Sequence, residues 1–172
     1  NIQRIWDEYN GTGIQVGVYD DGVDFNHADL NDNYIAGLQV LDNLGNVVDA
    51  FPDLAGDAHG TACAGLIGAE ANNGAGGVGV AWGVDLTGVN IFGAGTYGDV
   101  NGSLANFLAV VNQAASRFDI SSNSWGSTPV YDLAGQSLNS TGFANQVSAA
   151  YGVLSSTGRA GLGTIITQAA GN

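Results

Sequence analysis

The stretch that most constrains the fold is residues 14–30, where an apolar run ends abruptly in two carboxylates and a glycine. The run over residues 14–19 predicts a buried strand. Asp20 and Asp21 follow at once, and Gly22 allows the chain to turn away tightly. Open α/β sheets place their chemistry at such strand ends. Taken alone, the stretch favours a plain strand followed by an Asp-Gly turn.

Strand-like and helix-like patterns alternate along the rest of the chain. We expect further strands over 84–92, 119–125 and 163–170, helices over 1–10, 59–71, 102–117 and part of 137–158, and loops over 31–58 and 72–79. This alternation predicts an α/β fold with a mainly parallel sheet and helices on both faces. We find no internal repeat and no interdomain linker, so one domain is expected.

Composition narrows the function classes. The chain has 172 residues, of which 45% are hydrophobic, enough for a buried core. Its net charge of −13, with three Arg and no Lys, argues against a nucleic-acid partner. The same charge suits a cation, a cationic substrate or solubility. No apolar run approaches the ~18 residues of a membrane span. The single cysteine cannot form an internal disulfide.

Three later stretches carry polar groups next to small residues. They are His59-Gly60-Thr61, Ser124-Trp125-Gly126 and Ala170-Gly171-Asn172. Alone, each has a plain reading: a structural histidine, a strand end and a turn residue. An asparagine at a strand end could also donate its amide N–H to a developing oxyanion.

Together these stretches resemble the subtilases, the subtilisin-like serine peptidases. The resemblance runs through Asp-x-Gly with His-x-Asp-Leu, His-Gly-Thr-x-Cys-Ala-Gly, Ser-x-Ser-Trp-Gly and Ala-Gly-Asn, in that order. The doubled acid at Asp20-Asp21 and the cysteine at Cys63 are most similar to the kexin/furin branch. The resemblance implies a three-layer, subtilisin-like α/β fold, incomplete in this chain, and a protein or peptide substrate.

The resemblance assigns roles to individual residues. Asp20 is similar to the acid of an Asp-His-Ser triad and His59 to its general base. Asn172 is similar to the oxyanion-hole asparagine. Ser124, Trp125 and Gly126 match a segment that pairs with the substrate backbone. Cys63 is expected to be a small apolar residue near His59 rather than a nucleophile, although it could make the enzyme thiol-sensitive if the pocket admits mercurials.

The family's nucleophile lies in a Gly-Thr-Ser motif, and this sequence contains none. We therefore expect residues 1–172 to be the N-terminal portion of a catalytic domain, inactive alone, with the remaining C-terminal part as a partner. The alternative is a degenerate, calcium-binding member of the fold that acts only as a binding module. A Gly-Thr-Ser motif downstream would favour the peptidase.

The resemblance also implies structural calcium. Asp29 and Asn73 match side-chain ligands, and the backbone carbonyls of three residues match the others: Glu70, Ala75 and Gly77. Mixed oxygen donors at about 2.4 Å are what calcium requires. The alternative is a Gly/Asn turn in which Asp29 caps a helix.

Specificity and location are also expectations from the resemblance. Kexin-like enzymes cut after basic residues because acidic groups line their pockets, and Asp21 matches one such group, near the second subsite. Pro129, however, stands where furin-like enzymes have an aspartate that helps to bind the primary Arg, and Asp132 would have to replace it. The resemblance implies a secreted or periplasmic protein.

Overall fold

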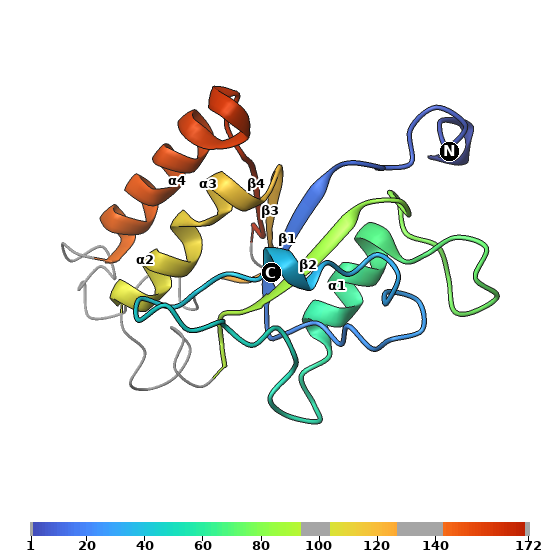
Figure 1. Cartoon of the computed structure of the whole chain (residues 1–172), viewed down its shortest axis with the longest axis horizontal. Helices are drawn as coiled ribbons and strands as arrows, with labels where there is room; N and C mark the ends of the chain where they lie inside the picture. Colours follow the sequence, from blue (N-terminus) through green and yellow to red (C-terminus); the bar gives the residue numbers. More distant parts are fainter. Residues whose placement is uncertain (1, 94–103, 127–142, 171–172) are drawn as a thin grey trace.

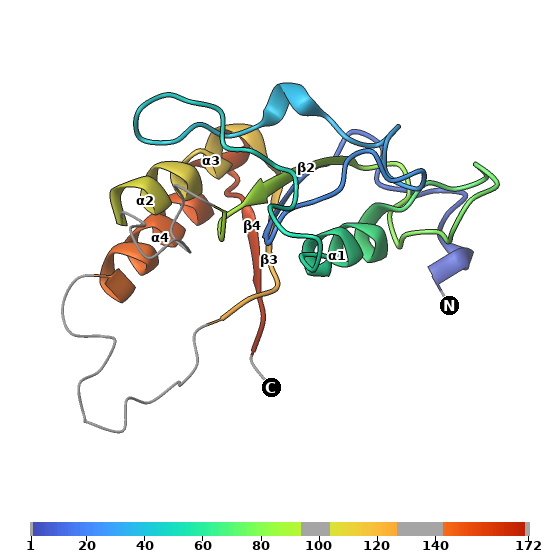
Figure 2. The same ribbon diagram turned by 90° about the horizontal axis from the view of Figure 1, so that it is seen from below.

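The computed structural model describes residues 2–93, 104–126 and 143–170. Four parallel strands form one sheet in the order β2-β1-β3-β4. They are β1 (Gln15–Asp20), β2 (Asp85–Asn90), β3 (Ile120–Asn123) and β4 (Ile165–Gln168). Helix α1 (His59–Gly68) lies on one side of this sheet, and α2 (Leu104–Asn112), α3 (Ala114–Arg117) and α4 (Phe143–Gly161) lie on the other (Figures 1 and 2). The predicted parallel sheet with helices on both faces is confirmed.

Strand β1 lies inside the sheet, between β2 and β3, and it is buried on both faces. Val16 and Val18 pack with Ala64 of α1 and Leu86 of β2 in one core cluster. Tyr19 points the other way, into a second cluster that includes Phe107 of α2, Phe118 and Leu154 of α4. Side chains of a strand alternate between its faces, so Asp20 follows Val16 and Val18 onto the α1 face.

Helix α1 approaches the sheet closely through small residues one turn apart. Gly60, Ala64 and Gly68 are its buried positions. A Cβ on Gly68 would lie 2.6 Å from a side-chain carbon of Val84, so only glycine permits this approach. The close packing brings the amino end of α1 to the carboxyl end of β1.

The strand order creates a point where the chain reverses its direction across the sheet. β1 pairs with β2 on one side and with β3 on the other. Helix α1 of the first connection lies on one face, and α2 to α4 lie on the opposite face (Figure 2). In open α/β sheets with the order 2-1-3-4, ligand sites form at the carboxyl ends of β1 and β3.

The predicted element boundaries need three changes. The helix predicted over 1–10 was wrong, because the chain forms only a 3-10 helix at Ile2–Arg4 followed by turns. Its apolar residues Ile5 and Tyr9 are exposed in the part of the chain that the structure describes. A second 3-10 helix, Ala36–Leu38, lies within the predicted loop. The helix predicted over 102–117 is divided into α2 and α3.

In the part of the chain that the structure describes, no helix has both the length and the apolar character needed to cross a bilayer.

Candidate active site

The polar residues singled out by sequence gather at the carboxyl ends of β1 and β3. Asp20 ends β1, and Ser124 to Gly126 follow β3 directly. His59 is the first residue of α1, which packs on β1. This is the reversal point of the sheet, where the fold favours a site.

Asp20 and His59 form a direct hydrogen bond. Nδ1 of His59 lies 2.8 Å from Oδ1 of Asp20. The Asp20 side chain is 2% exposed, whereas that of His59 is 59% exposed. The carboxylate is therefore fixed inside the protein, and the imidazole reaches outward with Nδ1 held and Nε2 available to a further group.

The close fit depends on Gly60. A Cβ at this position would lie 2.3 Å from the carbonyl oxygen of Gly22 and 2.8 Å from Cβ of Asp20. Gly22 itself has φ +109, which favours glycine, and packs against the backbone of Pro52. Two glycines thus set the distance between the strand end and the helix.

The two charged groups alter each other's proton affinity. The hydrogen bond and charge of Asp20 raise the pKa of His59. Burial raises the pKa of Asp20, and the hydrogen bond from His59 opposes that rise. A buried carboxylate beside an imidazole stabilises the protonated imidazolium, which is what a general base needs after it accepts a proton.

Asp21 caps the amino end of α1. Its Oδ1 accepts a hydrogen bond of 2.6 Å from the backbone N–H of Gly60, and its Oδ2 accepts one of 3.2 Å from that of His59. A carboxylate at a helix amino end is stabilised by the unpaired N–H groups there. Sequence reasoning considered only a substrate-binding role for Asp21. The doubled acid before a glycine turn and a helix beginning His-Gly could have indicated the cap.

The segment after β3 lies beside the Asp20–His59 pair. Ser124 hydrogen-bonds to the thiol of Cys63, which is one helical turn after His59. The Trp125 ring packs edge-on against Phe92 and Phe107. The backbone carbonyl oxygen of Trp125 accepts a hydrogen bond from the side-chain amide of Gln168. Trp125 therefore anchors the segment through its side chain, and the following Gly126 is exposed.

Cys63 has the properties of a protonated thiol. Its Sγ lies 3.8 Å from Nδ1 of His59 and 3.9 Å from Nε2. Burial raises the pKa of the thiol, and the nearby acids Asp20 and Asp21 act in the same direction. A thiol of this kind is a poor nucleophile at neutral pH.

The residues proposed for calcium meet at one loop. Oδ2 of Asp29 accepts a hydrogen bond of 2.8 Å from the N–H of Gly77. The amide nitrogen of Asn73 lies 3.0 Å from Oδ1 of Asp29, 3.3 Å from Oε2 of Glu70 and 3.1 Å from the carbonyl oxygen of Ala28. Hydrogen bonds from Gly77 and Asn73 lower the pKa of Asp29.

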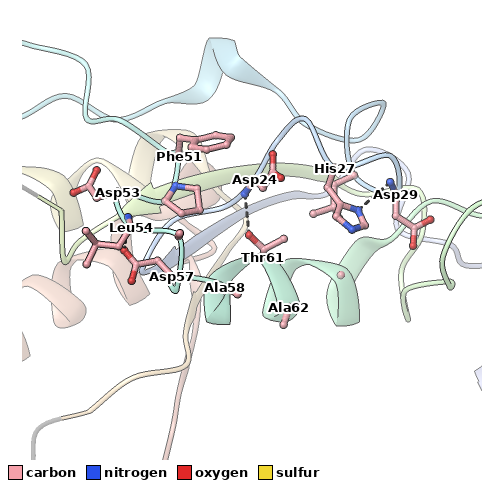
Figure 3. A pocket seen from close by; sticks show the side chains of 14 residues that line it. Asp24, His27, Asp29, Phe51, Asp53, Leu54, Asp57, Ala58, Thr61 and Ala62 are labelled. Carbon is pink, nitrogen blue, oxygen red and sulfur yellow. Dashed lines mark hydrogen bonds between the residues drawn. The ribbon is translucent and has the colours of Figure 1, made fainter.

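A cavity of about 650 Å³ lies beside the candidate site (Figure 3). Ala58, Thr61 and Ala62 line it from α1, whereas His59 and Cys63 do not, so it opens on a neighbouring face of that helix. The acids around it were not singled out as a group from sequence, because they come from separate segments: Asp24, Asp29, Asp53 and Asp57.

Three residues named from sequence fall outside the described ranges. They are Asn172, the expected oxyanion donor, and Pro129 and Asp132, which bear on specificity.

The model of the subtilase family matches residues 11–172. The chain belongs to the subtilase family. The match takes in both the Asp20–His59 pair and the loop around Asp29.

This subtilase chain also aligns over its whole length with curated proteases. It is 36% identical to the dibasic-processing endoprotease of Schizosaccharomyces pombe and 34% identical to furin of Bos taurus. The alignments cover 100% of this chain but 22% and 20% of those two proteins. The resemblance to the kexin/furin branch is thereby confirmed, while the chain spans about a fifth of the length of these relatives.

Solved structures of subtilisin-like proteases share the fold. The serine protease of Aeromonas sobria superposes with a TM-score of 0.67 at 25% identity, covering 87% of this chain and 24% of that one. MycP1 from Mycobacterium smegmatis superposes with a TM-score of 0.65 at 25% identity, covering 99% of this chain and 43% of that one. The predicted subtilisin-like α/β architecture is confirmed.

Proposed function

We propose that this subtilase chain supplies the acid and base of a serine endopeptidase. The observation that carries the proposal is the 2.8 Å contact between Nδ1 of His59 and Oδ1 of the buried Asp20. With Nδ1–H donated to the carboxylate, the lone pair of Nε2 is free to accept a proton from a serine hydroxyl. Asp20 then stabilises the imidazolium, and His59 returns the proton to the leaving amine.

The serine comes from a segment beyond residues 1–172 in this proposal. Support comes from a sheet face that the described residues leave uncovered at β4: α1 packs on β1 and β2, while Ile165 of β4 is 50% exposed and pairs with Ile120, a residue on the α1 side. Exposed apolar surface of this kind favours a partner, here the remaining C-terminal part of the domain carrying Gly-Thr-Ser. We call the two parts together the complete protease.

The substrate is a peptide held against the segment after β3. Ser124 to Gly126 would pair with its backbone as an added strand, and Asn172 would donate its amide N–H to the oxyanion. One such donor contributes roughly 3–4 kcal/mol to transition-state stabilisation. Cleavage after basic residues is supported by the net charge of −13. A relative with 36% identity, the dibasic-processing endoprotease of Schizosaccharomyces pombe, also supports it.

Calcium fits the loop around Asp29. Three oxygens converge on the amide nitrogen of Asn73, from Ala28, Asp29 and Glu70. Such a group of oxygens suits a hard cation in place of that nitrogen. The ion would take the carboxylate of Asp29 and, once the Asn73 amide turns over, its oxygen, which accepts from the N–H of Ala75 in this structure. The backbone carbonyls of three residues would complete the set: Glu70, Ala75 and Gly77. The ion would supply stability by tying the loop after α1 to the segment after β1. We place the protein outside the cell or in the periplasm.

The test is cleavage by the complete protease of peptides that differ only in the residue before the cut. We expect turnover, faster with Arg than with Phe at that position, and none from the wild-type chain 1–172 alone. His59→Ala in the complete protease should abolish turnover while the melting temperature is kept. Turnover by the isolated chain would contradict the mechanism. A folded complete protease that cleaves no peptide would favour the binding module.

A further inference from the structure

The cavity beside the candidate site combines acidic groups with apolar walls. Four aspartates line it, and the described lining residues include His27 but no Lys or Arg. Phe51 and Leu54 supply apolar surface from the loop before α1 (Figure 3). One of the aspartates, Asp29, is assigned to the calcium loop in the proposal above. The other three carboxylates have no part in the proposed proton transfers.

The cavity begins next to the proposed base. Asp57 and Ala58, the two residues before His59, line it, and Ala62 of α1 lines it as well. In the proposed reaction Nε2 of His59 gives its proton to the leaving amine, so the leaving half of the peptide lies at the amino end of α1. The other half would pair with residues 124–126. The cavity is therefore placed to receive a side chain from the leaving half.

The fold holds two of the cavity's carboxylates in position. Oδ2 of Asp57 accepts a hydrogen bond of 3.0 Å from the backbone N–H of Leu54, and Oδ1 of Asp24 accepts one of 3.0 Å from that of Asn26. The backbone N–H of Asp24 also donates to the hydroxyl oxygen of Thr61 at 2.9 Å, which ties this segment to α1. An ionised carboxylate has about four acceptor positions, so each keeps capacity for a further donor. Groups that are already oriented cost little to order when a ligand binds.

We propose that this cavity binds an arginine or lysine side chain from the first two residues after the cut, with Asp57 and Asp24 as its specificity-determining residues. The inference rests on the proposed function. Such side chains have an apolar stem and a cationic head. The stem would pack on Phe51 and on Leu54, which is 69% exposed in this structure, and the head would take charge-assisted hydrogen bonds from the carboxylates. The volume of about 650 Å³ accommodates a long side chain together with its backbone.

The test uses two series of peptides with the same basic residue before the cut. One series varies the first residue after the cut and the other varies the second, with Arg or Gln at that position. In at least one series kcat/KM of the complete protease should be about tenfold higher for Arg, which is the effect of one hydrogen bond to a charged group. Asp57→Asn and Asp24→Asn should each lower this ratio, because asparagine keeps the acceptor for the backbone N–H and loses the charge. The ratio should also fall as salt is added.

The matched control is Asp7→Asn, which removes the same charge from an exposed residue that does not line the cavity and should leave the ratio unchanged. Binding is measured apart from chemistry in His59→Ala, by fluorescence anisotropy of the labelled peptides, and melting temperatures show that each variant is folded. Equal kcat/KM for Arg and Gln in both series, or a ratio that neither cavity variant lowers, would overturn the subsite and leave the peptidase proposal intact. Tighter binding of Arg peptides that Asp57→Asn removes, in a protein that cleaves none of them, would support the subsite and contradict the proposed function.

Discussion

Replacing Gly60 by alanine should uncouple His59 from Asp20. The added methyl group would lie 2.3 Å from the carbonyl oxygen of Gly22, and ordinary contact begins at 3.4 Å. Because the obstacle is backbone, α1 has to retreat by about 1 Å at its amino end. His59 moves with the helix, and the 2.8 Å contact with Asp20 lengthens or breaks. A misplacement of about 1 Å costs roughly 10²-fold in turnover.

Stability gives a second readout of the same change. Overpacking should destabilise the protein by about 1–3 kcal/mol, against a gain in helix propensity of up to about 1 kcal/mol. The matched control is Gly65→Ala in the same helix, where an added Cβ meets nothing within 4 Å of the described structure. Peptide turnover and melting temperature should fall in Gly60→Ala and be maintained in Gly65→Ala. Turnover of Gly60→Ala within about threefold of wild type would refute the claim that this glycine sets the catalytic distance.

Three further predictions concern the pair and the calcium loop. Asp20→Asn should lower kcat by about 10⁴-fold with little change in KM, because His59 loses its favoured tautomer; unchanged kcat in steady-state assays would contradict this role. Asp20 raises the pKa of His59, so the ring should titrate above the 6.5 of an ordinary histidine, and activity should fall as the pH drops through that midpoint. Titration of the ring by NMR should show a lower midpoint in Asp20→Asn, and an equal midpoint would refute the coupling. Removal of calcium by a chelator should lower the melting temperature of the complete protease. Calcium at 100 times its Kd would stabilise the folded state by about 2.7 kcal/mol, and the chelator removes this contribution. Asp29→Asn should remove most of this calcium response, whereas a wild-type melting temperature unmoved by chelator would rule out the ion.

The sequence predicted the sheet better than the details of the site. The apolar run ending at Asp20 identifies a buried parallel strand, since such strands are apolar on both faces. Helical spacing misled at residues 1–10, where Ile5 and Tyr9 have the pattern but are exposed in the described structure. Periodicity describes what a segment could bury and says nothing about whether a neighbour is present.

The capping by Asp21 illustrates what pattern reading left out. The resemblance to known proteases assigned Asp21 to substrate recognition. The structure adds a second role, because both its oxygens accept hydrogen bonds from the N–H groups of His59 and Gly60. That contact depends on how closely α1 approaches β1, which is a three-dimensional fact set by Gly60. The cavity acids Asp24 and Asp57 are likewise separated in sequence and meet only through the fold.

The most direct test of the central claim, that Asp20 and His59 activate a serine, is covalent labelling. The complete protease is treated with a fluorophosphonate, and the modified residue is identified by mass spectrometry in wild type and in His59→Ala. The account predicts one labelled serine, in a Gly-Thr-Ser motif outside residues 1–172, and labelling slowed by orders of magnitude in His59→Ala. A labelled serine within residues 1–172, or equal labelling rates in the two proteins, would contradict it.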